Sequence, residues 1–246
     1  MCIRDSHYAL LSVGGELMAA FETSLAPVSL SPIVMQAVAL GVEQDKITTF
    51  LLPVQASNHP IYNPSLDYSV YLSQPFFFVL FQVLILLITV YAVGIEIKFR
   101  TADEWLFVAK GNMVTAVLGK LLPYTIIFIL IGWLANYVMF GILHIPFQGS
   151  WWLINMITVL FVIATQALGL FIFSLFPAVS LVISVVSMVG SLGATLSGVT
   201  FPVSNMYPLV RDASYLFPVR HFTEMIQTML YGGGGFIYLW PSMVIL

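Results

Sequence analysis

The chain has 246 residues, of which 60% are hydrophobic and only 8% are charged, and its net charge is −3 at neutral pH. A soluble domain carries about 25% charged residues, so this composition excludes a water-soluble globular domain and favours a membrane protein. No basic patch is present that would bind nucleic acid. The single cysteine, Cys2, excludes an internal disulfide.

Long uncharged runs predict where the chain crosses the membrane. No Asp, Glu, Lys or Arg occurs from Tyr68 to Ile95 or from Leu121 to Val210. A spanning helix needs about 20 apolar residues, and these runs are continuously apolar rather than alternating, so we predict an all-α polytopic bundle. The expected spans are residues 75–95, 121–143, 151–176 and 178–201, with the start of a further span at 236–246.

Residues 1–70 differ from the rest, because they hold six of the eleven acidic residues and are mixed in polarity. We expect them to form part of an α/β domain outside the membrane, with short helices at 16–25 and 32–42 and a strand at 48–56. No apolar leader precedes this domain, so we also expect a first spanning helix upstream of it. Residues 71–246 would then be the transmembrane domain.

Half of all Lys and Arg residues lie in the segment 96–120 between the first two expected spans. Positively charged loops remain in the cytoplasm, so we expect this loop inside the cell and the preceding domain outside. Residues 202–235 then also lie outside, and their prolines and four consecutive glycines predict short broken helices there.

Four stretches of the chain carry a recognisable pattern. They are Tyr62-Asn63-Pro64; Glu96 with Thr101–Leu106; Gly119–Tyr124; and Ser197-Gly198 to Phe201-Pro202 followed by Pro218 and His221-Phe222. In this order they resemble the ABC-2 type exporter permeases, and in particular the subgroup with a periplasmic domain between spans one and two. Ala102 departs from the glycine usual in the second stretch, and Lys110-Gly111 replaces a common proline.

This resemblance implies an ABC-2 (type V exporter-like) helical bundle that acts as the permease subunit of an ABC exporter in the bacterial inner membrane. It implies a second permease subunit, contact with membrane lipid, and separate cytoplasmic ATPases that bind ATP and magnesium. In some members a periplasmic adaptor protein joins them. The expected cargo is an amphipathic or drug-like molecule, and no cofactor, metal or catalytic residue is expected on this chain.

The resemblance makes the cytoplasmic loop a site that transmits movement of the ATPase. The residues alone allow two interpretations of segment 100–108. It is either a short amphipathic helix that docks on a partner or an ordinary solvated loop. Gly119-Lys120 is not a phosphate loop, because Leu121 stands where Ser or Thr is needed. The expected coupling residues are Glu96, Arg100, Thr101, Glu104, Trp105, Gly119 and Lys120.

A second set of candidates lines the translocation path and its outer gate. Small residues recur every four positions in the fourth span, where they would serve a moving dimer or pore face, or static packing within one subunit. His221 and Glu224 lie three apart, so a membrane-embedded enzyme is an alternative. The gate candidates are Gly190, Ala194, Gly198, Phe201, Pro202, Pro218, His221 and Phe222.

The energy source is indicated by what the spans lack. Carriers driven by ion gradients place ionisable groups inside the membrane, whereas the run from Leu121 to Val210 contains only His144, in a turn. An ion-coupled carrier nevertheless stays as an alternative, because a sodium site can be built from backbone carbonyls.

Overall fold

The computed structural model describes residues 68–145, 147, 149–199, 203, 206–231, 240, 242–244 and 246. The chain divides into two units, Met1–Leu66 and Asp67–Leu246, and all described residues belong to the second. The predicted α/β domain, its helices and its strand therefore lie outside the described residues. So do Phe201, Pro202 and most of the segment expected to begin a further span.

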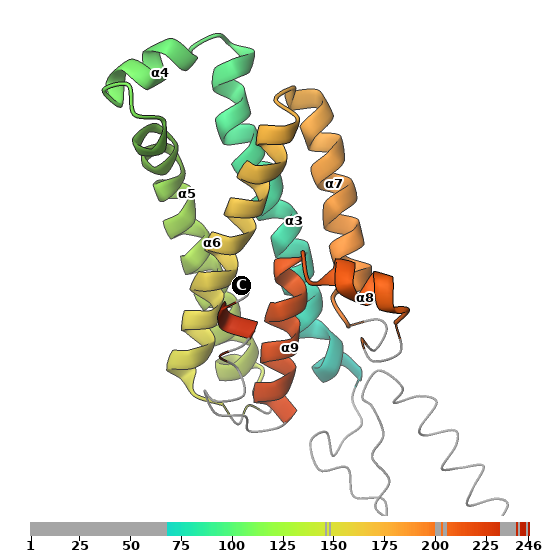
Figure 1. Ribbon diagram of the computed structural model, residues 1–246. Coiled ribbons are helices and arrows are strands. Elements are labelled where there is room, and N and C mark those ends of the chain that lie inside the picture. The colour runs from blue at the N-terminus through green and yellow to red at the C-terminus, as the bar shows by residue number, and fades with distance from the viewer. Residues whose placement is uncertain are drawn as a thin grey trace, which may run out of the picture. The chain divides into compact units, whose positions relative to one another are not determined.

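Four helices are long and apolar enough to cross a membrane, which confirms the predicted helical bundle. They run in alternating directions in Figure 1. Their bounds are α3 Tyr68–Lys98, α5 Met113–Asn136 with its π-helical extension η2 Tyr137–Ile142, α6 Trp151–Leu175, and α7 Val179–Leu196.

Two helix boundaries differ from the expected ones. Helix α3 begins at Tyr68, so Pro75 lies inside the helix and not in its first turn. Helix α5 begins at Met113, so Lys120 belongs to a helix rather than to the loop. In both helices the first turns contain polar or charged residues and precede the apolar run. The carbonyl groups that prolines leave unpaired are tolerated inside spans when neighbouring groups satisfy them.

Three shorter helices complete the described unit: α4 Ala102–Val108, α8 Pro208–Ser214 and α9 Pro218–Tyr231. Helix α4 lies at the end of the bundle where the α6–α7 connection also lies, whereas α8 and α9 lie in the other half (Figure 1). The helices α8 and α9 agree with the broken helices predicted for the outer segment.

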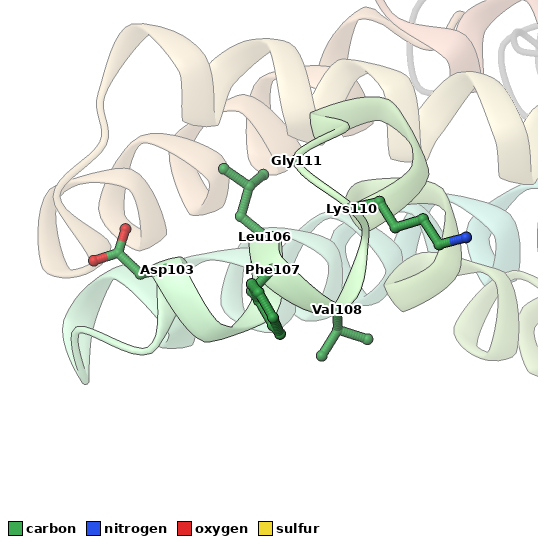
Figure 2. A pocket seen from close by; sticks show the side chains of 6 residues that line it. All are labelled: Asp103, Leu106, Phe107, Val108, Lys110 and Gly111. Carbon is green, nitrogen blue, oxygen red and sulfur yellow. The ribbon is translucent and has the colours of Figure 1, made fainter.

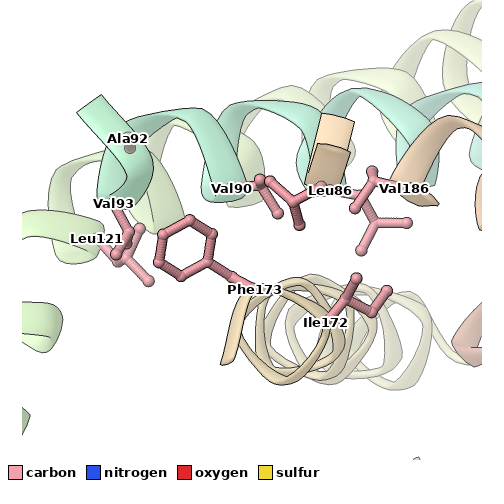
Figure 3. Close-up of a cluster of buried hydrophobic side chains, with 9 residues drawn as sticks. Leu86, Val90, Ala92, Val93, Leu121, Ile172, Phe173 and Val186 are labelled. Atoms are coloured by element: carbon pink, nitrogen blue, oxygen red, sulfur yellow. The ribbon is translucent and has the colours of Figure 1, made fainter. Parts of the chain in front are cut away.

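Helix α3 is the centre of the bundle, because it packs against α5, α6, α7 and α9. Lipid tails are as apolar as these side chains, so close packing rather than exclusion of water holds the helices together. Figure 3 shows one such cluster where α3, α5, α6 and α7 meet. Its buried members are Leu86, Val90, Ala92, Val93, Leu121, Ile172, Phe173, Val182 and Val186.

Uncharged side chains form hydrogen bonds between α5 and α6. The Asn136 amide nitrogen donates to the Thr158 hydroxyl at 2.9 Å, and the Thr125 hydroxyl donates to the Gln166 amide oxygen at 2.7 Å. Such bonds contribute about 0.6 kcal/mol each in membrane proteins. They therefore align the two helices more than they stabilise the bundle.

Two glycines of α5 differ in the space that surrounds them, so we expect their substitution to have different effects on stability. A methyl group at Gly132 would lie 2.5 Å from the Thr158 side chain, whereas one at Gly119 would meet nothing within 4 Å. We expect Gly132→Ala to lower stability by about 1–3 kcal/mol through overpacking. Gly119→Ala should leave stability unchanged or raise it by roughly 0.5–1 kcal/mol. Thermal unfolding of both variants in detergent measures the difference, and equal losses would contradict the packing described.

Candidate functional site

Helix α4 lies between two helix ends of the same kind. At the end of α3, Arg100 adopts φ 60°, and the Thr101 N–H donates to the Glu96 carbonyl at 3.0 Å. At the end of α4, Lys110 adopts φ 55°, and the Gly111 N–H donates to the Leu106 carbonyl at 2.9 Å. Both are Schellman helix ends, with a left-handed residue that reverses the chain. Together they define where α4 begins and ends.

Side chains from α3, α4 and α5 meet beside this helix. Lys120 of α5 forms an ion pair with Glu96 of α3, and the Thr101 hydroxyl donates to the other oxygen of the same carboxylate. The Lys120 ammonium also lies 5.3 Å from the centre of the Trp105 ring of α4. Both charged side chains are only about one fifth exposed (18% and 21%). The cluster therefore ties α4 to two membrane spans.

The structure thus brings together four of the seven predicted coupling residues: Glu96, Thr101, Trp105 and Lys120. The other three, Arg100, Glu104 and Gly119, are exposed and do not join the cluster. Asn112 completes the segment, because its side chain accepts hydrogen bonds from the Val114 and Thr115 N–H groups at the start of α5.

The outer side of α4 presents apolar side chains to its surroundings. Phe107 is 85% exposed and Val108 is 82% exposed, and Figure 2 shows both pointing away from the other helices. They line a shallow open hollow together with Asp103, Leu106, Lys110 and Gly111. Exposed apolar side chains on a short amphipathic helix suit either contact with a partner or contact with the membrane surface.

The predicted gate residues of α7 do not share one helix face. Gly190 is buried against α3, where a methyl group would lie 2.7 Å from the Val83 side chain, and Ala194 is half-buried. Gly198 lies beyond the end of the helix at Leu196 and adopts φ 85°. The four-residue spacing was therefore wrong as evidence for a single face, because the helix ends before its third member.

Helix α9 begins at Pro218 and buries one face in the interior of the bundle. The Phe222 ring lies 4.2 Å from Phe78 of α3 and 4.7 Å from Phe161 of α6. His221 is buried, and its Nε2 lies 3.0 Å from the Tyr215 carbonyl oxygen, to which it donates. Glu224 is exposed, so His221 and Glu224 do not form an acid–base pair.

Two functional candidates in this region were not recognised in the sequence. Gln82 of α3 accepts a hydrogen bond from the Val219 N–H at 2.9 Å. Arg220 is 3% exposed, donates to the Arg211 carbonyl and the Ser214 hydroxyl, and stacks 3.8 Å from the centre of the Tyr215 ring. The available signal was their polarity in or beside apolar spans. Among the described residues, no three His, Cys, Asp or Glu side chains gather to hold a metal ion.

Comparison with known families decides what kind of protein carries this arrangement. The family model described as "ABC-2 family transporter protein" matches residues 17–246. The chain belongs to the ABC-2 family. This membership confirms the resemblance to the ABC-2 permeases, and it makes the chain a transmembrane permease component of an ABC transporter. No solved structure matches the chain.

Curated relatives of this ABC-2 protein are permeases of Escherichia coli strain K12. The chain is 30% identical to "Inner membrane transport permease YhhJ" over 43% of its own length and 28% of that protein. It is 27% identical to "Probable multidrug ABC transporter permease YbhS", over 54% of the chain and 36% of the relative. It is 24% identical to "Probable multidrug ABC transporter permease YbhR", over 74% of the chain and 49% of the relative. The match thus spans less than half of each relative.

The ion pair can be tested by a double-mutant cycle. We expect Glu96→Ala and Lys120→Ala each to lower stability by about 1–3 kcal/mol, because each leaves a largely buried charge unpaired. The double variant should lose less than the sum of the two. Thermal unfolding in detergent measures all three. As a control, Asp212→Ala should have almost no effect, because its pair with Arg211 is long (3.8 Å) and exposed. Strictly additive losses at Glu96 and Lys120 would contradict the coupling.

Proposed function

We propose that this ABC-2 protein is the permease subunit of an ATP-driven exporter that moves an amphipathic or drug-like molecule out of the cytoplasm or the inner leaflet. The observation that carries the proposal is the cluster of Glu96, Thr101, Trp105 and Lys120, which links a cytoplasmic helix to two membrane spans. The names of the relatives YbhS and YbhR support a drug-like cargo.

In this proposal, α4 is the part that the ATPase pushes. Phe107 and Val108 enter an apolar groove of the ATPase, and the exposed acids Asp103 and Glu104 meet basic groups at its rim. The ATPase binds ATP and magnesium and closes, and α4 moves with it. Because the ion pair resists separation of α3 from α5, the two spans follow as rigid bodies.

An ion-coupled carrier is less well supported by the described residues. The middle turns of α5 and α6 contain no Asp, Glu, Lys, Arg or His. The hydrogen bonds between the two helices join amide and hydroxyl groups instead. Glu96 is held by Lys120 and Thr101 at the end of α3, which is a poor position for a proton relay. The enzyme alternative loses its basis with the separation of His221 from Glu224.

The second permease subunit is proposed to lie against α7. Its exposed side carries Ser184, Ser187 and Ser191 among apolar side chains, and the three hydroxyls donate to carbonyl groups of the same helix. The exposed apolar side chains are Leu181, Met188 and Leu192. The exposed side of α5 is instead apolar, with Leu122 and Leu130 more than half exposed. A surface that faces lipid is apolar, so α5 is assigned to lipid. The hydroxyl-bearing side of α7 is assigned to the partner subunit and the substrate path.

Further parts of the assembly follow from the same proposal. The protein resides in the inner membrane, as the name of YhhJ states for that relative. It belongs to the subgroup with a periplasmic domain between spans one and two, and a periplasmic adaptor continues the path outward. Substrate leaves beside α8 and α9, which lie in the half of the bundle away from α4 (Figure 1).

Substitutions on α4 test the coupling role. We expect Phe107→Ser and Glu104→Arg to leave insertion and stability normal, because both side chains are exposed. Each should uncouple ATP hydrolysis from export by roughly tenfold or more, about 1.4 kcal/mol of lost contact. Val114→Ser is the matched control, because Val114 is exposed at the same end but lies on α5. Parental export per ATP in both α4 variants, measured in proteoliposomes with the ATPase, would contradict the proposal.

The proposed orientation has its own test. In a protein freed of Cys2, a cysteine at position 150 should react with a membrane-impermeant thiol reagent added outside intact cells. A cysteine at position 110 should react only after the membrane is opened. Both positions are exposed: Lys110 lies just before α5, and Ser150 lies directly before α6, beyond the other end of α5 and η2. The reverse labelling pattern would overturn the orientation predicted from the basic loop.

A further inference from the structure

Helix α9 begins inside the bundle, at the side of α3. The first N–H groups of a helix have no partner within it, and lipid offers none. Pro218, the first residue, has no N–H to satisfy. The next residue, Val219, donates its N–H to the side-chain oxygen of Gln82, which lies 137 positions earlier and is fully buried. Gln82 therefore acts as the cap of a helix that belongs to a distant part of the chain.

The space around the Gln82 amide is shaped to hold it. Gly193 of α7 lies beside it, and a methyl group there would be 2.7 Å from the amide nitrogen. The amide is thus enclosed between α7 and the start of α9. Its nitrogen has no hydrogen-bond partner in the described structure, so the oxygen is the atom that Gln82 contributes.

A second contact joins the same two helices one turn away. Phe78 of α3 lies 4.2 Å from Phe222 of α9, and both rings contact Phe161 of α6. Phe78 and Gln82 are four residues apart and share a face of α3. Helix α9 is therefore attached to α3 through a hydrogen bond at its first turn and an aromatic contact at its second.

The hairpin of α8 and α9 is held together by its own side chains. Arg220 binds the Arg211 carbonyl and the Ser214 hydroxyl of α8, and His221 binds the Tyr215 carbonyl in the connecting turn. The positions of α8 and α9 are thus coupled to each other, so a displacement of the first turn of α9 displaces α8 as well.

The same helix that caps α9 carries the cytoplasmic cluster at its other end. Gln82 and Glu96 are fourteen residues apart on α3, which at 1.5 Å per residue corresponds to about 21 Å along one uninterrupted helix. We propose that Gln82 is the positioning residue through which α3 carries its movement to the α8–α9 hairpin. This inference rests on the proposed function, because it needs α3 to be moved from the cytoplasmic side.

Three substitutions separate this role from a general role in packing. Gln82→Met keeps the size of the side chain but removes the acceptor. Gln82→Glu keeps an oxygen at the positive end of the α9 dipole and should therefore function. Gln74→Met is the control, because Gln74 is equally buried on α3 and neither of its amide atoms has a hydrogen-bond partner.

Export per ATP hydrolysed is the first measurement, made with the complete permease and its ATPase in proteoliposomes. We expect a fall of about tenfold for Gln82→Met, the size expected for one unpaired buried N–H, with ATP hydrolysis retained. Gln82→Glu and Gln74→Met should stay within about twofold of the parent.

Labelling of a cysteine at position 216, in the exposed turn between α8 and α9, is the second measurement. Its rate should depend on nucleotide in the parent, in Gln82→Glu and in Gln74→Met, but not in Gln82→Met. A merely structural defect would lower stability without removing this dependence. Parental export in Gln82→Met, or equal losses in Gln82→Met and Gln74→Met, would overturn the inference alone. A parent without ATP-dependent export would overturn the proposed function and the inference with it.

Discussion

A peptide group inside a membrane has no water to bind, and the need to pair each N–H and carbonyl governs this protein. The spans meet it as long helices. Where helices end or begin, other groups take over: Thr101 pairs with the last turn of α3, and Asn112 caps α5. The beginning of α9 lies against the interior of the bundle, and Gln82 supplies its acceptor. The positions of polar side chains in this apolar chain are thus largely those that the backbone requires.

Helix α3 gains its importance from this requirement. It contacts most of the other described helices, and it carries both Gln82 and Glu96. One end is tied by an ion pair to α5 and, through Thr101 and Trp105, to the short helix α4. A helix that is hydrogen-bonded along its length transmits displacement without folding or unfolding any part of the chain. This makes α3 suited to carry movement from one end of the bundle to the other.

Charged and uncharged polar side chains occupy different parts of the bundle. The ion pair of Glu96 and Lys120 lies at the end of the bundle that carries α4, where both side chains are partly exposed. The contacts between α5 and α6 use amides and hydroxyls, which cost less to bury than charges. Among the described residues Arg220 is a buried cation. Its guanidinium group stacks on the Tyr215 ring and donates hydrogen bonds to two oxygen acceptors.

Much about this protein follows from the sequence by itself: four spans, a basic loop with a short helix, broken helices near the C-terminus and the ABC-2 resemblance. Hydropathy, charge and proline positions are read along the chain, and helices in lipid form from such local signals. The sequence did not reveal that Lys120 meets Glu96, that Gly190 faces Val83, or that Gln82 caps a helix 137 residues away. Only the tertiary structure decided these contacts, because they depend on the rotation and depth at which the helices pack, and small shifts in packing change which side chains meet.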